Sequence, residues 1–190
     1  MAKRVVVVPY SEQWKTDFDI IRQHLLSAVK DVVISIEHIG STSIEGLSAK
    51  PIIDIDIVIK DYSVFDTIVE RLASLGYMHE GNLGIKDREA FDCKGNTALT
   101  KHHLYVCPEY SAELYRHIVF REYLRSRPEA VLKYSKIKED GARLFPDNID
   151  EYISYKSPYI EEIYRECEIK NEFFRYVEKT DSINDNQEEI

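Results

Sequence analysis

The sequence is poor in cysteine, and its cysteines do not have the spacing of a metal-binding motif. Cys93, Cys107 and Cys167 are the three cysteines among 190 residues, and they lie far apart in the chain. A disulfide-stapled domain needs an even set of cysteines, and a structural zinc site usually includes a close pair. We therefore expect the chain to fold on a hydrophobic core, without a disulfide framework or structural zinc.

Long apolar runs are also absent from the sequence. No stretch approaches the roughly 20 apolar residues that a membrane-spanning helix requires. The apolar run at residues 5–8 is followed too soon by polar residues to serve as a secretion signal. These features favour a cytoplasmic protein that does not bind a membrane.

Basic residues are fewer than acidic ones. The chain has 25 Lys and Arg against 34 Asp and Glu, a net charge of -9. Affinity for duplex nucleic acid comes largely from lysine and arginine, so a duplex partner is not expected. A local basic pocket for a small phosphorylated ligand remains compatible with this balance.

The length and residue pattern predict one domain. Residues 1–170 are expected to form it, with a helical C-terminal part over about 109–170, while 171–190 lack an apolar face and read as a frayed or disordered tail. Residues 4–8 are expected to form a short strand or a lead-in. Periodicity predicts strands at 32–39, 51–59, 77–81 and 100–108, and helices at 11–29, 64–76, 111–128, 128–145 and 148–170, the last kinked or broken at Pro158. The predicted class is α/β (α+β), with a small mixed sheet, helices on one face and the helical part beside it.

Two aspartates interrupt the very apolar strand predicted at 51–59. Side chains alternate along a strand, so Asp54 and Asp56 share one face about 7 Å apart, while the isoleucines on either side of them share the other face. Partial burial of two like charges is costly unless a cation compensates, and Mg²⁺ accepts one or two carboxylates with phosphate and water. A solvated edge strand with two incidental acids is the alternative. Relief of the repulsion predicts that removing either charge leaves the apo protein at least as stable.

A Gly-Ser-Thr turn precedes this strand. Gly40 lets the backbone bend tightly and lets a ligand approach, while Ser41 and Thr42 add hydroxyl and backbone N–H donors that suit a phosphate. An ordinary strand-ending turn would have the same composition, so the turn alone does not decide between the two interpretations.

The spacing between the turn and the aspartates is more informative. The Gly-Ser pair at 40–41 is followed after twelve residues by Asp-Ile-Asp-Ile at 54–57. This arrangement resembles the signature of the DNA polymerase β-like nucleotidyltransferase superfamily. The resemblance implies that the turn holds nucleotide phosphates, and that the two aspartates hold Mg²⁺ (or Mn²⁺) against the α-phosphate.

Several separated motifs narrow the resemblance. The segments EHIGSTSIEGLSAKPIIDIDI, HHLYV, FREYLRSRPE and YISYKSPYI together resemble the GrpB family, over nearly all of residues 5–170. The resemblance implies a nucleotidyltransferase-like fold. It does not supply a substrate.

One feature of the superfamily is missing where it is expected. A third carboxylate usually lies on a later strand, which here would be 100–108, and that segment contains no acid. His103 is a candidate to replace it as a metal or phosphate contact, and Asp92 or Glu89 are alternatives. If none of these residues replaces the third carboxylate, binding without catalysis becomes a credible alternative.

Four other residues are candidates for contact with an anionic ligand. Lys50 precedes the aspartate strand, and Arg121 and Lys156 belong to motifs that the resemblance highlights. For each of the three, a surface charge or a structural ion pair is about equally compatible. His38, two residues before the turn, is better explained as a structural histidine.

Taken together, the residues and the resemblance predict a Mg²⁺-dependent nucleotidyltransferase. It would transfer a nucleotidyl group from a nucleoside triphosphate to a small-molecule or protein hydroxyl. The alternative is a non-catalytic module that binds a nucleotide or a phosphorylated metabolite.

Overall fold

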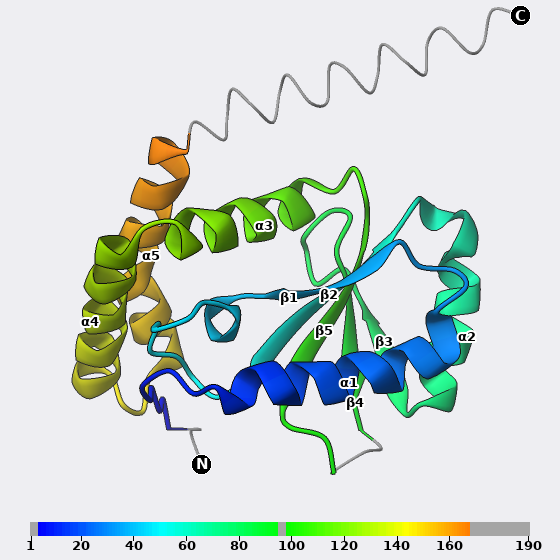
Figure 1. Cartoon of the computed structure of the whole chain (residues 1–190), viewed down its shortest axis with the longest axis horizontal. Helices are drawn as coiled ribbons and strands as arrows, with labels where there is room; N and C mark the ends of the chain where they lie inside the picture. Colours follow the sequence, from blue (N-terminus) through cyan, green and yellow to red (C-terminus); the bar gives the residue numbers. More distant parts are fainter. Residues whose placement is uncertain (1–3, 95–97, 168–190) are drawn as a thin grey trace, which may run out of the picture.

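A computed structural model describes residues 4–94 and 98–167, so the tail predicted at 171–190 lies outside the described residues. Its centre is a mixed five-stranded sheet in the order β1-β2-β5-β4-β3 (Figure 1). Strands β2 and β5 run parallel, and the other neighbours are antiparallel. The elements are α1 Gln13–Val29, β1 Ser35–Ile39, η1 Ser41–Ser43, β2 Ile53–Ile59, η2 Tyr62–Val64, α2 Phe65–Ser74, β3 Tyr77–Gly81, β4 Glu89–Cys93, β5 His102–Pro108, α3 Ala112–Arg125, α4 Pro128–Leu144 and α5 Ile149–Glu166.

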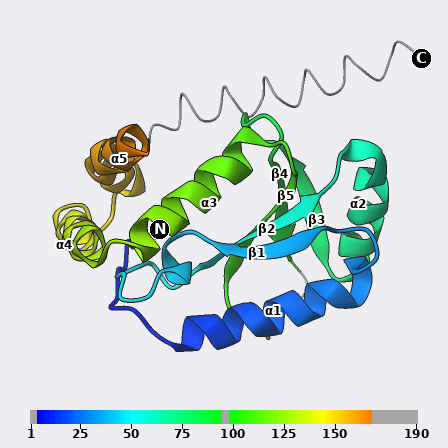
Figure 2. The ribbon, with the colours of Figure 1, turned by 45° about the horizontal axis from the view of Figure 1, so that its top comes forward.

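The helices lie on both faces of the sheet, which corrects the prediction that they cover only one. Helices α1 and α2 cover one face, while α3 crosses the opposite face near β1 and β5, and α4 and α5 pack beside α3 (Figures 1 and 2). The prediction was wrong because α3 was assigned to a separate helical part. Its position brings helical side chains over the aspartates of β2.

The larger core explains why β2 is so rich in isoleucine. Ile53, Ile55, Ile57 and Ile59 are all fully buried on the face that meets α1 and α2. Their helical partners include Trp14, Ile21, Leu25, Ile68 and Leu72. The alternation of side chains then leaves Asp54 and Asp56 on the opposite face, as predicted.

A second core joins the segment after η1 to the C-terminal helices. Ile44 and Leu47 are fully buried among aromatic side chains of α3, α4 and α5, including Phe120, Tyr134 and Tyr159. This packing anchors the chain immediately after the Gly-Ser-Thr turn, so the turn is held between the sheet and the helices.

Two local predictions are narrowed by the structure. Residues 4–8 are a lead-in without a strand, and within them Val8 makes an isolated bridge to Ala49. Helix α5 continues through Pro158, so the break that was one of the two alternatives there does not occur. The fixed φ of proline is compatible with a helix, and packing against α4 compensates for the hydrogen bond that proline cannot donate. Among the described residues, no helix combines the length and the apolar character needed to cross a membrane.

Candidate functional site

The two aspartates of β2 are paired with different imidazoles. Asp54 lies opposite His103 in the parallel register of β5, and Nδ1 of His103 is 2.8 Å from Oδ1 of Asp54. The Asp54 side chain is 31% exposed, whereas Asp56 is fully buried. The pair therefore presents one carboxylate to the surface and encloses the other.

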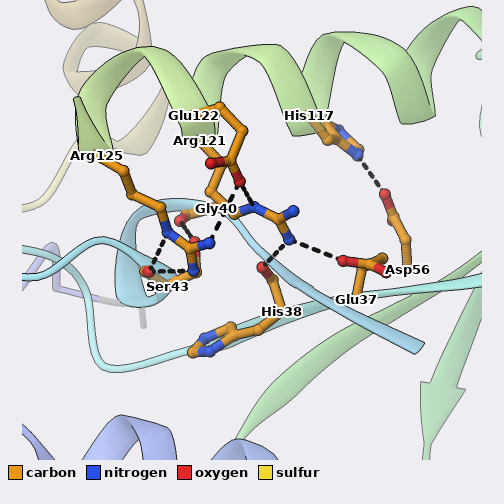
Figure 3. Close-up of polar contacts among 9 residues, drawn as sticks. All are labelled: Glu37, His38, Gly40, Ser43, Asp56, His117, Arg121, Glu122 and Arg125. Carbon is orange, nitrogen blue, oxygen red and sulfur yellow. Dashed lines mark hydrogen bonds and ion pairs between the residues drawn. The ribbon is translucent and has the colours of Figure 1, made fainter. Parts of the chain in front are cut away.

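Asp56 makes its ion pair with His117, which reaches down from α3 (Figure 3). Nδ1 of His117 is 2.7 Å from Oδ2 of Asp56, and Nε2 is 3.4 Å from Oε1 of Glu113. Burial opposes the charged ring, but the contacts to Asp56 and Glu113 outweigh it and raise the pKa of His117 to about 9. A buried imidazolium thus neutralises much of the Asp56 charge.

The remaining oxygen of Asp56 is the best indication of a cation site. Oδ1 is buried, and it has no hydrogen-bond partner within the described part of the chain. A buried carboxylate oxygen normally has a partner, and Mg²⁺ is a suitable one. No three His, Cys, Asp or Glu side chains among the described residues gather as a metal site, so two carboxylates would need substrate or water oxygens to complete the coordination.

Gly40 places the turn directly against Asp54. It has φ +67° and ψ -171°, a combination that is essentially restricted to glycine. A β-carbon at this position would lie 2.3 Å from Oδ2 of Asp54. The glycine therefore allows both the turn geometry and the close approach of the carboxylate, and η1 follows immediately.

His38 contacts the turn through the hydroxyl of Thr42. Its Nε2 lies 3.0 Å from Oγ1 of Thr42, and its ring stacks on Phe18 at 4.6 Å between centroids. Thr42 donates to the carbonyl of Ile52, so the histidine is the donor to Thr42. Burial, with a smaller contribution from Arg125 and Arg121, lowers the pKa of His38 to about 4, despite the opposing effect of Asp54. The ring is therefore neutral, and the structural role expected for His38 is the one observed.

The depressed pKa predicts acid sensitivity. The pKa of His38 is about 4 in the folded state, against the ordinary histidine pKa of 6.5, so the unfolded chain takes up the proton first as pH falls. Stability should fall between pH 6.5 and 4, with this histidine contributing about 2 to 3 kcal/mol of the loss. Urea unfolding across this range should show a shallower pH dependence for His38→Gln than for the wild type. The same pH dependence of stability in the two proteins would contradict the lowered pKa of His38.

Two arginines of α3 attach the helix to β1 and the turn (Figure 3). Nη1 of Arg121 is 2.9 Å from both Oε2 of Glu37 and the carbonyl oxygen of His38. Arg125 donates to the carbonyl oxygen of Ser43 at 2.9 and 3.3 Å. Arg121, a predicted anion contact, thus forms the structural ion pair that was its alternative.

A cavity lined by lysines lies on one side of Asp54. Its volume is about 210 Å³, and its lining includes Ser41, Thr42, Lys50, His103, Lys138 and Lys156. The structure therefore brings together most of the residues that the sequence singled out, from the turn, both central strands and α5. Lys138 of α4 joins them, although nothing in the sequence distinguished it from the other lysines of that helix.

The lysines of this cavity are held close together without a matching set of carboxylates. Lys138 is 3% exposed, and burial, together with the charges of Lys156 and Lys50, lowers its pKa well below the usual value. Burial and Lys50 lower the pKa of Lys156 in the same way. A bound anion would reverse these shifts, so the cavity is electrostatically suited to phosphate.

A second cavity also has Asp54 in its lining. It has a volume of about 200 Å³ and is lined by Gly40, Asp54, Arg88, Tyr105, His117 and Tyr164, among others. The Arg88 guanidinium stacks on the Tyr105 ring at 4.5 Å, and its Nε is buried with no partner in the described ranges. Asp54 thus lines both a lysine-lined cavity and one lined by aromatic rings and an arginine.

Neither candidate for a third carboxylate lies beside the pair. Glu89 is opposite Val106, on the other face of the sheet, and bonds to His79 at 2.8 Å. Asp92 is on β4, which β5 separates from β2, so it lies about 10 Å from the aspartates. The position opposite Asp56 on β5 is occupied by Tyr105.

The architecture places the chain in a known fold class. A chain of the GLD-2/RNP-8 complex superposes with a TM-score of 0.53 at 13% identity, over 77% of this chain and 59% of that one. This likeness bears on the fold alone. With the mixed sheet and its flanking helices, it confirms the predicted α/β class with a small mixed sheet and packed helices.

Closer relatives identify the family. A family model described as GrpB protein matches residues 4–166, and the chain belongs to the GrpB family. UPF0157 protein YqkA of Bacillus subtilis is 34% identical over 158 residues, which are 83% of this chain and 46% of YqkA. This chain thus spans about half the length of that relative. The crystal structure of conserved protein GrpB from Enterococcus faecalis has a TM-score of 0.76 at 30% identity, over 88% of this chain and 99% of that chain.

Proposed function

We propose that this protein is a Mg²⁺-dependent nucleotidyltransferase that acts at the surface carrying Asp54 and Asp56. One observation supports the proposal above all. Asp54 lines both a lysine-rich cavity that includes Ser41 and Thr42 and a second cavity lined by aromatic rings and Arg88. A transferase needs two such subsites that meet at the reacting phosphorus.

The lysine-lined cavity is the proposed site for the triphosphate. Lys50, Lys138 and Lys156 would contact the β- and γ-phosphates, and backbone N–H groups and hydroxyls of Ser41 and Thr42 would contact the same chain of phosphates. The charge balance supports this placement, because three lysines gather there without a comparable number of acids.

Asp54 and Asp56 would hold the Mg²⁺, and the orphaned Oδ1 of Asp56 is the observation that fits it. When bound, the ion would neutralise negative charge that develops on the transferred phosphoryl group. The second cavity would hold the acceptor, with its hydroxyl facing Asp54. In the reaction, the acceptor hydroxyl would release its proton to water as its oxygen bonds to the α-phosphorus, the bond from that phosphorus to the bridging oxygen of the β-phosphate would break, and pyrophosphate would leave.

The proposal is tested by label transfer. The purified protein is incubated with each α-³²P-labelled nucleoside triphosphate, with Mg²⁺ or Mn²⁺, and with small-molecule or protein fractions of a bacterial lysate. We expect label to enter one fraction with release of pyrophosphate, and Asp54→Asn to abolish both. No transfer from any triphosphate, despite tight nucleotide binding, would refute the transferase.

Lys138 provides a prediction that separates binding from stability. Lys138→Met keeps the length of the side chain but removes a buried charge, so nucleotide affinity should fall at least about tenfold. The apo protein should become about 1 to 2 kcal/mol more stable, because burial disfavours the charged form of Lys138. Calorimetric binding and urea unfolding measure the two effects.

The control for this variant is Lys133→Met on the same helix. Lys133 is 53% exposed and pairs with Glu162 at 2.9 Å, so its replacement should change neither property appreciably. Equal effects of the two substitutions on nucleotide affinity would show that Lys138 has no specific role.

A non-catalytic nucleotide-binding module is the second candidate, and the absence of a carboxylate opposite Asp56 on β5 favours it. His103, which contacts Asp54 and lines the lysine cavity, discriminates between the two. In an enzyme, His103→Ala should reduce turnover more than nucleotide affinity. If it weakens binding alone and the wild type transfers no label, the binding module is the correct description.

A further inference from the structure

The second cavity contains an arginine whose N–H donors are not matched by acceptors of the protein. The Arg88 side chain is 13% exposed, and it reaches this cavity from the loop that precedes β4. Its Nε is buried and has no hydrogen-bond partner among the residues that the structure describes. Its Nη1 lies 4.0 Å from Oε1 of Glu113, which is too far for a hydrogen bond. Because buried donors normally have partners, a ligand in this cavity would supply the missing acceptor atoms.

The carboxylates near Arg88 offset only part of its charge. Glu113 is also 3.4 Å from Nε2 of His117 and 3.8 Å from Nε of Arg116, so three basic side chains share one carboxylate. Asp54, the carboxylate in the cavity lining, has its Oδ1 2.8 Å from Nδ1 of His103. The guanidinium of Arg88 therefore retains the capacity to bind an anion.

Tyr105 restricts the position of this guanidinium. The guanidinium carbon lies 4.5 Å from the centre of the Tyr105 ring. Tyr105 is opposite Asp56 in the register of β2 and β5, so its side chain is on the sheet face that carries Asp54. A planar guanidinium held in this way has a fork of N–H groups that matches two oxygens of a carboxylate or a phosphate.

The size of the cavity limits what else it can hold. Its volume is about 200 Å³, below the roughly 300 to 1,000 Å³ of pockets that enclose drug-sized ligands. Ile39, Phe120 and Tyr164 form an apolar part of its lining. The cavity thus suits a small molecule with one anionic end, and it is too small for a second nucleotide.

We propose that Arg88 makes the second cavity specific for a small acceptor that carries an anionic group, a carboxylate or a phosphate, beside its reacting hydroxyl. The anion would bind the N–H fork of Arg88, and the hydroxyl would face Asp54. The inference rests on the proposed function, because it places the acceptor in this cavity, and it adds the chemical class of that acceptor. Arg88 determines specificity in this arrangement.

Three compounds with one carbon skeleton test the requirement for an anion. Glycerol is neutral, glycerate carries a carboxylate and glycerol 3-phosphate carries a phosphate. Each is titrated into the full chain without nucleotide or metal, and the backbone amide shifts are followed by nuclear magnetic resonance. We expect saturable binding of one or both anions, with shift changes at Arg88, Tyr105 and Tyr164, and at least about tenfold weaker binding of glycerol. The tighter of the two anions identifies the preferred group.

Three results of this titration would overturn the proposal. They are the absence of saturable binding of either anion, binding of glycerol as tight as that of the anions, and shift changes confined to Ser41, Thr42 and Lys50. The last result would place the anion in the lysine-lined cavity instead.

The role of Arg88 is tested by Arg88→Gln, which retains an N–H donor but removes the charge and the fork. Affinity for the bound anion should fall at least about tenfold, whereas affinity for α,β-methylene ATP with Mg²⁺ should change less than about twofold. Unchanged anion affinity in the folded variant would overturn the assignment. A tenfold loss of nucleotide affinity would also overturn it, because Arg88 would then contact the nucleotide phosphates. The wild-type shift changes remain decisive if the variant does not fold.

The matched control is Arg127→Gln. The Arg127 guanidinium also lies over a tyrosine ring, that of Tyr123 at 4.2 Å, but it donates to the Ser126 hydroxyl at 2.9 Å and is in the lining of neither cavity. This variant should change neither affinity. Equal losses of anion affinity in the two variants would show that Arg88 has no specific role.

The acceptor class and the transferase fail separately. Label transfer from a nucleoside triphosphate to a neutral acceptor alone would overturn the anion requirement and leave the transferase intact. Anion binding that depends on Arg88, without label transfer from any triphosphate, would refute the transferase and support the anion site.

Discussion

Gly40→Ala should abolish nucleotide binding and lower stability by several kcal/mol. The added β-carbon would lie 2.3 Å from Oδ2 of Asp54, in a backbone conformation at φ +67° that strains any other residue. Either Asp54 or the turn must move, and both are parts of the proposed site. Calorimetric titration with a non-hydrolysable nucleotide and urea unfolding measure the two losses.

Gly84→Ala is the control that distinguishes backbone strain from the steric clash with Asp54. Gly84 has φ +82°, but a β-carbon there would meet nothing within 4 Å. This variant should lose about 1 kcal/mol of stability and keep its nucleotide affinity. If Gly40→Ala behaves like Gly84→Ala, the close approach of the turn to Asp54 has no functional meaning.

Asp56→Asn should destabilise the apo protein strongly, by about 3 to 5 kcal/mol, and abolish metal binding. Asp56 is fully buried, and its replacement leaves the His117 imidazolium without its nearest anionic partner. Asp54→Asn should cost less than about 1 kcal/mol, since that side chain is 31% exposed. Thermal and urea unfolding of both variants measure the difference.

A double variant tests whether the ion pair of Asp56 with His117 explains the stability that Asp56→Asn loses. Asp56→Asn combined with His117→Gln removes both charges, so it should recover most of the stability that Asp56→Asn loses. Equal stability of the two single aspartate variants would contradict the different environments that the structure assigns to them. It would instead agree with simple relief of like-charge repulsion, as inferred from the sequence.

The strand pattern was sufficient to predict where the aspartates lie. The alternation of isoleucine and aspartate along β2 predicted one buried apolar face and one acidic face, and the structure confirms both. On β5, His103 and Tyr105 lie opposite Asp54 and Asp56 in the parallel register. These predictions succeed because strand geometry is local, and a period of two residues determines the face.

The partners supplied by the helices could not be predicted. His117 and Lys138 meet the site only because α3 and α4 lie where they do, and helical periodicity does not state which sheet face a helix covers. Arg121 shows the same limit, since its ion pair with Glu37 depends on how α3 crosses β1. The repulsion expected between the aspartates was likewise modified by a histidine 61 residues away from Asp56 in sequence.

The central proposal is that Asp54, Asp56 and the lysine-lined cavity bind a metal–nucleotide complex. Calorimetric titration with α,β-methylene analogues of the four nucleoside triphosphates, with and without Mg²⁺, tests it most directly. At least one analogue should bind the wild type only with Mg²⁺, and its affinity should fall at least about tenfold in Asp54→Asn and in Lys138→Met. The proposal would be contradicted if no analogue binds, or if binding is independent of Mg²⁺ and unchanged in both variants.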